Sequence, residues 1–233
     1  MKKLFFSLLL TLSLGFLVVT ILGNSMQVIS NIVMPSERCI IIDAGHGGFD
    51  GGAVSADGCY EKNLNLEFSK KLDEILTVNG YKTIMIRNED VSVNSKDDNY
   101  SAKKSDIYNR LKVGQKYPQA IFISIHQNSF RQKKSCGSQV FYGAKNKESE
   151  HLAKIIRENI HEKIQKENER EIKKADSNLY IMKNTENVAV LLECGFLTNP
   201  EELKLLKNPN YQQDLCFTVF LAIEQYFNET EET

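Results

Sequence analysis

One stretch constrains the fold of this chain more than any other: an apolar run that changes abruptly into a glycine-rich loop. It covers residues 39–61 and reads CIIIDAGHGGFDGGAVSADGCYE. The run 39–42 consists of β-forming residues, which predicts a strand buried on both faces in a mostly parallel sheet. The glycines after it allow sharp turns of the backbone. His46 follows the end of this strand, where open α/β sheets bind their ligands, and is therefore a candidate site residue.

A phosphate-binding loop is the first alternative for these glycines. However, Asp50 stands where the third glycine of G-x-G-x-x-G is needed, and no G-K-[ST] sequence is present. We therefore set the phosphate interpretation aside.

The N-terminus predicts export. Lys2 and Lys3 precede residues 4–22, which carry no charge and have nearly the length that spans a bilayer. We expect residues 1–25 to be a signal peptide or membrane anchor and residues 26–38 to be a tether. Gly23 and Ser25 are small enough for a cleavage position, and cleavage stays open. The domain is thus expected to be extracytoplasmic, secreted or anchored, with membrane contact only through the N-terminal segment.

Charge and cysteine content exclude several classes. The 29 basic and 30 acidic side chains give a net charge of −1, so no nucleic-acid binding is expected. The five cysteines are an odd number without a C-x-x-C pair, which fits neither a zinc finger nor a disulfide framework. Cys39, Cys194 and Cys216 lie among apolar neighbours and are expected to be buried thiols. A bridge between Cys59 and Cys136 stays open.

The rest of the chain alternates between short apolar runs and amphipathic segments. Further strands are predicted at residues 81–86, 120–125, 138–142, 179–182 and 188–192. Helices are predicted from Glu61 to about residue 79, around 107–111, and at 152–164, 200–206 and 211–226, with 163–174 as an exposed helix end and loop. The pattern predicts an α/β fold with a mixed, mostly parallel sheet of about six strands, flanked by helices on both faces. The main folded domain is expected to cover 39–228, followed by an acidic tail at 229–233.

Polar residues follow three of these strands. His46, His126 and Glu193 each come after an apolar run, and Glu61 begins a helix. If the strands are adjacent and parallel, these side chains meet at one edge of the sheet. Two imidazoles and a carboxylate bind zinc with a fourth position open, as in hydrolytic zinc sites. Glu61 is the better ligand because it shares the loop of His46, which leaves Glu193 as the general base.

Each of these residues also has a purely structural interpretation. A single histidine after a strand is typical of a hydrogen-bonded loop residue, and a glutamate at a helix start is typical of a cap or dipole partner. His151 and His161 lie in a charged helix and are expected at the surface. Asp43 and Asp50 either orient imidazole N–H groups or cap the loop.

Four ordered motifs resemble a known family. IIIDAGHGGFDGGA, YEKNLNL, IFISIHQNSF and AVLLECGFLTNPEE are similar to the signatures of the zinc-dependent N-acetylmuramoyl-L-alanine amidases, and the resemblance runs over residues 39–227. It implies that His46, Glu61 and His126 bind Zn²⁺ and that Glu193 is catalytic. The implied reaction is hydrolysis of the amide between N-acetylmuramic acid and L-alanine, on peptidoglycan glycan strands with stem peptides.

Other positions refine the resemblance. Arg87 and Asp90 resemble the family's T-R-x-x-D and Arg110 its L-x-x-R, which implies structural roles. The chain departs from the family at Ala44 and Val188, where proline is usual; these changes affect loop rigidity and remove no ligand.

A further resemblance, to one subgroup of this family, concerns the biological role. The N-terminal segment, the bare catalytic domain, GSQVFYG and NLYIMKNT are similar to the germination-specific amidases of spore-forming bacteria. This implies spore cortex processing that leads to muramic lactam, with the enzyme between the forespore membranes. Two alternatives stay open. One is an idle or partner-activated peptidoglycan-binding module, with an activating protein docked on residues 148–174. The other is another zinc peptidase or deacetylase of the cell wall.

Overall fold

The computed structural model describes residues 38–95, 100–132 and 134–231. The predicted leader and nearly all of the predicted tether lie outside these residues. In the described part of the chain, no helix is both long and apolar enough to cross a membrane.

Strands and helices alternate along the described chain. The strands are β1 (Cys39–Ala44), β2 (Lys82–Met85), β3 (Ile121–Asn128), β4 (Gln139–Tyr142), β5 (Lys173–Lys174) and β6 (Ala189–Phe196). The helices are α2 (Glu61–Val78), α3 (Ala102–Lys116), α4 (Glu148–Lys163), α5 (Tyr180–Asn184), α6 (Pro200–Leu206) and α7 (Pro209–Glu231).

The six strands form one mixed sheet in the order β2-β1-β3-β6-β4-β5. β1 runs parallel to both β2 and β3, and β3 runs parallel to β6. β4 is antiparallel to β6, and β5 pairs with β4 at the edge of the sheet. The prediction of a mixed, mostly parallel sheet is confirmed. Its centre, β1-β3-β6, is parallel, so the carboxyl ends of these three strands lie at one edge.

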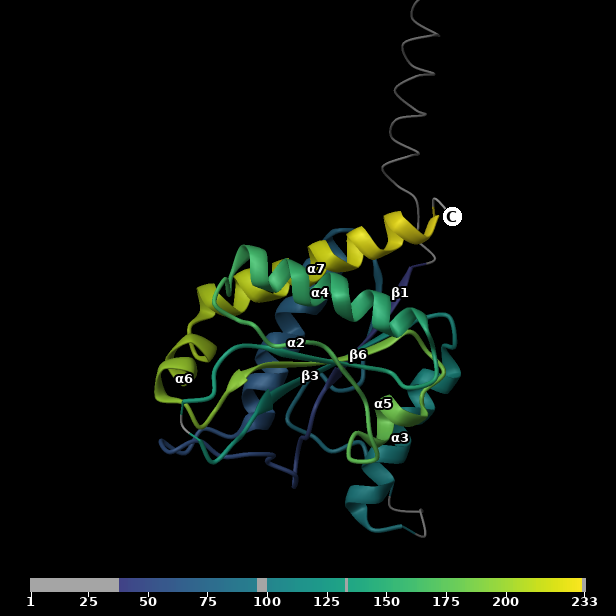
Figure 1. Ribbon diagram of the computed structural model, residues 1–233. Coiled ribbons are helices and arrows are strands. Elements are labelled where there is room, and N and C mark those ends of the chain that lie inside the picture. Colours follow the sequence, from purple (N-terminus) through teal and green to yellow (C-terminus); the bar gives the residue numbers. More distant parts are fainter. Residues whose placement is uncertain (1–37, 96–99, 133, 232–233) are drawn as a thin grey trace, which may run out of the picture. The chain divides into compact units, whose positions relative to one another are not determined.

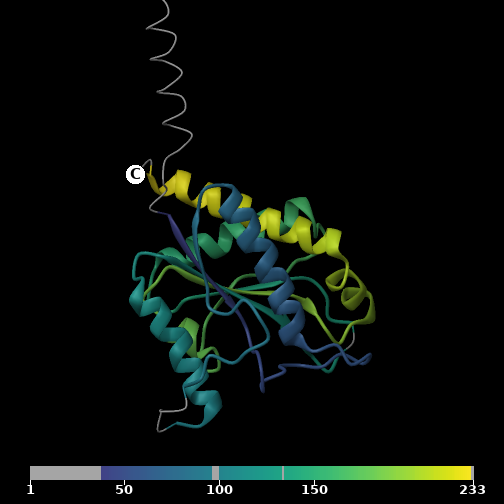
Figure 2. The ribbon, with the colours of Figure 1, turned by 180° about the vertical axis from the view of Figure 1, so that it is seen from behind.

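Helices cover both faces of the sheet, as predicted (Figure 1 and Figure 2). Successive side chains of a strand point to opposite faces, and the two apolar clusters follow this alternation. Ile40 and Ile42 of β1 belong to the larger cluster, with buried residues of α2, α4, α6 and α7. Ile41 belongs to the smaller cluster, which includes Met182 of α5 and packs against Val113 of α3. Because helices cover both faces of β1, side chains on both of its faces must be apolar, which explains the continuous apolar run.

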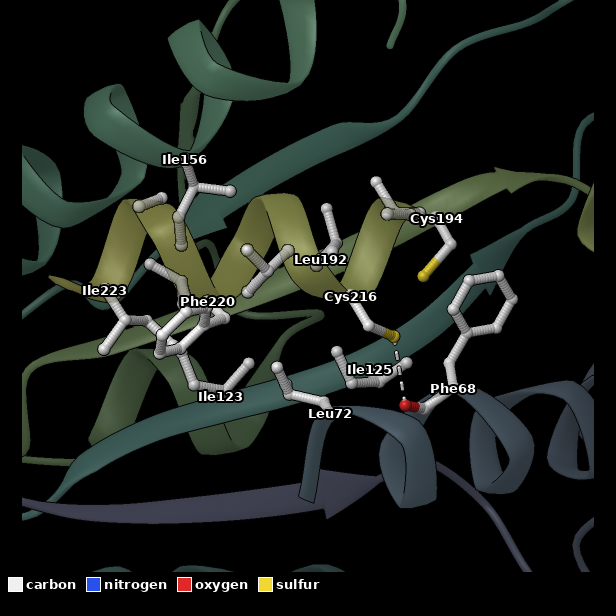
Figure 3. Packing of buried hydrophobic residues seen from close by; sticks show 14 of the residues in the cluster. Phe68, Leu72, Ile123, Ile125, Ile156, Leu192, Cys194, Cys216, Phe220 and Ile223 are labelled. Atoms are coloured by element: carbon white, nitrogen blue, oxygen red, sulfur yellow. Dashed lines mark hydrogen bonds between the residues drawn. The ribbon is translucent and has the colours of Figure 1, made fainter. Parts of the chain in front are cut away.

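The larger cluster joins α7 to the central strands (Figure 3). Phe68 of α2, Ile125 of β3 and Leu192 of β6 are buried against the apolar face of α7. Cys216 on that face is 4% exposed, and its thiol donates to the carbonyl oxygen of Phe68 at 3.3 Å. α7 is thus fixed over the strands that end at the site.

Two predicted details are wrong. Residues 179–182 are not a strand. They enter α5, where the amide of Lys183 donates to Leu179 O and that of Thr185 to Ile181 O, both at 2.9 Å. A four-residue apolar run does not distinguish a strand from a helical turn. The edge strand next to β4 is instead β5. It consists of two lysines, so no apolar pattern in the sequence predicts it.

Two further findings concern the cysteine pair that the sequence left open and the C-terminal end of the domain. Cys59 and Cys136 are free thiols, so the bridge left open by the sequence is not formed. α7 continues to Glu231, inside the segment expected as an acidic tail. The Glu231 carboxylate there accepts from Arg38 Nη2 at 2.7 Å.

Candidate metal centre

The parallel centre of the sheet brings the four predicted site residues to one cleft. Ala44 at the end of β1 pairs with Ile125 of β3, and His126 pairs with Glu193 of β6. His46 follows β1 directly. Glu61 is the first residue of α2. All four side chains line a cleft of about 470 Å³.

Glu61 lies between the two imidazoles. Its Oε2 is 3.2 Å from His46 Nε2, and its Oε1 is 3.0 Å from His126 Nδ1. One ligand atom from each residue lies within 4.8 Å of the other two, and this is the group of described residues that can hold a metal ion. The two rings meet edge to face, with centroids 5.0 Å apart.

The Glu61 carboxylate is buried and its oxygens are held from several sides. The amide of Ala53 donates to Oε2 at 2.9 Å, and that of Gln127 to Oε1 at 3.2 Å. Burial acts to raise the pKa of Glu61, but the hydrogen bonds with His126 and His46 outweigh it and hold this pKa well below its usual range. Burial likewise acts to lower the pKa of His126, but Glu61 raises it above its ordinary value. The carboxylate is therefore fixed as an anion.

Two glycines let the loop approach the three side chains. A Cβ atom at Gly45 would lie 2.2 Å from His126 Nε2, and one at Gly52 would lie 2.5 Å from Glu61 Oε2. His46 itself has φ 62°, a backbone conformation that few residues other than glycine adopt. The loop is thus shaped closely around these side chains.

Two buried arginines hold the backbone of this loop. Arg87 donates to the carbonyls of Ala44 at 2.8 Å and Gly45 at 3.0 Å. Arg110 donates to Ala44 O at 2.9 Å and to His46 O at 2.7 Å. Three consecutive carbonyls leading into His46 are therefore fixed by guanidinium donors.

The two acidic residues near His46 play different parts. Asp50 Oδ2 lies 3.0 Å from His46 Nδ1, so it orients this ring. Asp43 is buried, and its two oxygens are engaged elsewhere. Its Oδ1 accepts from Arg110 at 2.6 Å and its Oδ2 from Ser124 at 2.8 Å. The imidazole-orienting alternative therefore applies to Asp50 and not to Asp43.

Asn65 supports the site in a way that the sequence pattern did not reveal. It lies one helical turn after Glu61, and its amide donates to Glu61 Oε1 at 3.3 Å and to Gly45 O at 3.1 Å. It also accepts from Gln127 Nε2 at 3.3 Å. The i,i+4 spacing from Glu61 was the available signal, but an asparagine within a helix is by itself no sign of a site.

Glu193 differs from Glu61 in having few partners. Its Oε2 is buried and has no hydrogen-bond partner within the part of the chain that the structure describes. Burial raises the pKa of Glu193 to about 7, although the nearby His126 lowers it. A carboxylate of this kind can accept a proton near neutral pH and release it again.

His151 and His161 lie away from this cleft, on α4. His151 Nε2 contacts Glu229 at 2.8 Å and its side chain is 41% exposed, as expected for a surface histidine. His161 Nδ1 lies 3.1 Å from the carbonyl oxygen of Asn168.

An α/β sheet with such a group of side chains at the carboxyl ends of its strands is typical of a hydrolase. The family comparison makes the class specific. Residues 40–225 match the model of the N-acetylmuramoyl-L-alanine amidases. The chain belongs to this family of enzymes, which hydrolyse an amide in peptidoglycan.

Individual relatives agree with this membership. The germination-specific N-acetylmuramoyl-L-alanine amidase of Bacillus subtilis is 34% identical over 196 residues, which are 83% of this chain and 81% of the relative. The CwlD amidase from Clostridioides difficile, solved in complex with the GerS lipoprotein, has a TM-score of 0.77 and 35% identity, covering 82% of this chain and 99% of that one. The amidase AmiC2 of Nostoc punctiforme has a TM-score of 0.70 and 26% identity, covering 82% and 97%.

Proposed function

We propose that His46, Glu61 and His126 bind Zn²⁺. Two ligands that are each about 2.1 Å from one tetrahedral ion lie about 3.4 Å apart. The facing atoms of Glu61 and the two histidines are 3.2 and 3.0 Å apart, each through a different carboxylate oxygen, so both rings lie within reach of an ion bound to Glu61. The donor set of two imidazoles and one carboxylate suits zinc and leaves a coordination position for water. The observation that carries the proposal is the placement of Glu61 between both rings.

Glu193 is the general base in this proposal. A zinc ion bound there supplies a water molecule of lowered pKa and polarises a carbonyl. The Glu193 carboxylate, whose Oε2 has no hydrogen-bond partner among the described residues, accepts the proton of the attacking water as the bond from the water oxygen to the carbonyl carbon forms. It then donates that proton to the leaving nitrogen as the C–N bond breaks. Asp50 keeps the His46 ring in its orientation throughout.

The bond cut is the amide between the lactyl group of N-acetylmuramic acid and the L-alanine of the stem peptide. The products are a stem peptide with a free amino group and a glycan strand with a free lactyl carboxylate. Family membership and the open cleft support this assignment.

The test is the Glu193→Gln variant of the full-length chain. We expect it to retain about one zinc ion per chain, because none of the three ligands changes, and to lose turnover by a factor of about 10² to 10⁴. Glu201→Gln is the matched control, because this side chain is 78% exposed on α6. Mass analysis of digested peptidoglycan measures the products. Full activity in Glu193→Gln would refute its role, whereas deacetylated sugars or internally cut peptides would indicate a deacetylase or peptidase.

We further propose that the enzyme acts on spore cortex, on the route to muramic lactam. Residues 1–25 would direct export, residues 26–38 would tether the domain of 39–228, and 229–233 would form its acidic end. The germination-specific role of the Bacillus relative supports this proposal. Deletion of the gene should yield spores whose cortex fragments lack muramic lactam by mass spectrometry. Normal lactam content would contradict the cortex role and leave the amidase chemistry intact.

A protein partner is a further part of the proposal. The Clostridioides amidase was solved with a lipoprotein, and we propose that a lipoprotein also activates this chain by docking on residues 148–174. Zinc content and turnover should rise when the partner is added to the purified chain. Reversal of charge at the exposed Lys154 and Glu158 of α4 should abolish that increase and leave basal turnover unchanged. Full zinc occupancy and turnover without any partner would contradict activation.

A further inference from the structure

One wall of the cleft carries an aromatic side chain, Tyr180, that the catalytic proposal does not use. α3 and α5 pack side by side on the face of the sheet opposite α7 (Figure 1). Tyr180, the first residue of α5, lines the cleft together with His46 and Glu193 and is 38% exposed. An exposed aromatic ring beside the reacting centre is a surface on which a substrate group can pack.

Two further tyrosines stand behind Tyr180. The rings of Tyr180 and Tyr108 are 5.4 Å apart and tilted by 49°, and the rings of Tyr108 and Tyr100 are 4.9 Å apart and nearly perpendicular. Lys104 Nζ lies 4.5 Å from the Tyr100 ring centroid. Such contacts stabilise the arrangement of the rings. Tyr180 therefore packs on a neighbouring ring of α3, which favours its present orientation.

The charges around the cleft argue against an anionic group at this wall. The lysine and the arginine that line the cleft already have carboxylate partners. Lys103 Nζ lies 3.4 Å from Asp50. Arg110 is paired with Asp43 and Asp106, both at 2.6 Å. The charge of each of these cations is therefore already balanced by a nearby carboxylate, which weakens the attraction of the wall for a carboxylate of a stem peptide.

A neutral ring with an apolar face and polar edges fits the wall better. A pyranose ring has a face of C–H groups that can lie against an aromatic face, and hydroxyl groups at its rim that can bond to a phenolic O–H or to water. The glycan strand of the substrate supplies such rings on both sides of the muramic acid whose amide is cut.

We propose that Tyr180, supported by Tyr108 and Tyr100, binds a neighbouring sugar ring of the glycan strand. The inference rests on the proposed function, because it names the part of the substrate that this wall of the same cleft recognises. It predicts that the enzyme prefers longer strands to a single muramoyl peptide. The preference then comes from binding and not from the chemical step.

The test measures binding separately from hydrolysis. Full-length chains carrying Glu193→Gln are titrated with glycan strands from which all stem peptides have been removed, and the dissociation constant is measured. Tyr180→Ala in this background should weaken binding by about tenfold, the effect of losing one aromatic contact. Tyr180→Phe keeps the ring and should stay within about twofold of the parent. Phe217→Ala, at a 47%-exposed aromatic on α7, is the matched control and should not change the constant.

The outcomes separate the two proposals. Equal binding of strands by the Tyr180→Ala and parent chains overturns the subsite, whether or not the active enzyme cuts the amide. Weaker binding of free stem peptides by Tyr180→Ala, with strand binding unchanged, overturns it as well and assigns the wall to the peptide. If strand binding depends on Tyr180 but the active enzyme cuts no muramoyl amide, the subsite is supported and the proposed reaction is contradicted.

Discussion

His46 shows how much surrounding structure one site residue needs. Its backbone has a positive φ, which costs an ordinary residue about 1 kcal/mol or more. The donors that hold the carbonyls of Ala44, Gly45 and His46 come from Arg87 and Arg110, which are far away in the sequence. These contacts offset the strain within the folded chain. A preformed loop of this kind would keep the entropy cost of the proposed metal binding low.

Gly45 gives a residue-scale prediction. Its φ is not in the left-handed region, so Gly45→Ala introduces no backbone strain, but the new Cβ would lie 2.2 Å from the His126 ring. The ring must shift from its present position, and we expect zinc affinity to fall by at least about tenfold, as when a metal ligand loses its orientation. Competition with a chromophoric chelator measures this affinity.

Gly58→Ala is the control for that substitution. It lies in the same long loop, with φ +84° and nothing within 4 Å of the place that a Cβ atom would take. It should lower the free energy of unfolding by about 1 kcal/mol through backbone strain and leave zinc affinity unchanged. Equal loss of zinc in both variants would contradict a specific effect of the contact with His126, because Gly58→Ala makes no such contact.

At the scale of elements, one buried side chain joins the residues just before β6 to the turn between α3 and β3. The Asn187 amide, just before β6, donates to Tyr117 O at 2.9 Å and to Ala120 O at 2.8 Å, between α3 and β3. We expect Asn187→Ala to lower the free energy of unfolding by about 1–2 kcal/mol, because the buried Ala120 carbonyl loses this donor, whereas the Tyr117 carbonyl keeps its bond from the Ala120 amide. Urea denaturation measures this value. Asn210→Ala, at an exposed position of α7, should change it by less than about 0.5 kcal/mol; a similar loss in both variants would contradict this role of Asn187.

The sequence predicts some elements well and others not at all, for physical reasons. Strands β1, β3 and β6 are recognisable because burial on both faces demands continuous apolar runs, and each run is followed by a polar residue that the sheet brings to the cleft. β5 and α5 are not recognisable. A two-residue edge strand of lysines has no apolar pattern, and the short run before Met182 satisfies either conformation. Long-range hydrogen bonds such as those of Arg87 and Asn187 depend on tertiary placement, which local patterns do not contain.

At the scale of the whole molecule, two buried cysteines report how α7 is held to the sheet. Cys194 of β6 and Cys216 of α7 lie on opposite sides of the same interface in the larger core (Figure 3). Burial raises the pKa of Cys216 to about 12 and raises that of Cys194 well above its ordinary value. Cys136 is exposed. Because the thiolate is the reactive form, only an opening that separates α7 from the sheet makes the two core thiols reactive.

Thiol labelling at neutral pH therefore has an expected order. Cys136 should react first, while Cys194 and Cys216 should react together, at the rate of global unfolding, because α7 packs on both α2 and α4 and cannot leave alone. Mass spectrometry of labelled peptides over time measures each rate, and unfolding followed by circular dichroism gives the global rate for comparison. If Cys216 were labelled much faster than the chain unfolds, α7 would be opening on its own. The strands that carry His126 and Glu193 would then be stable without the C-terminal helix. That result would contradict the expectation that the core between α7 and the sheet unfolds as one unit.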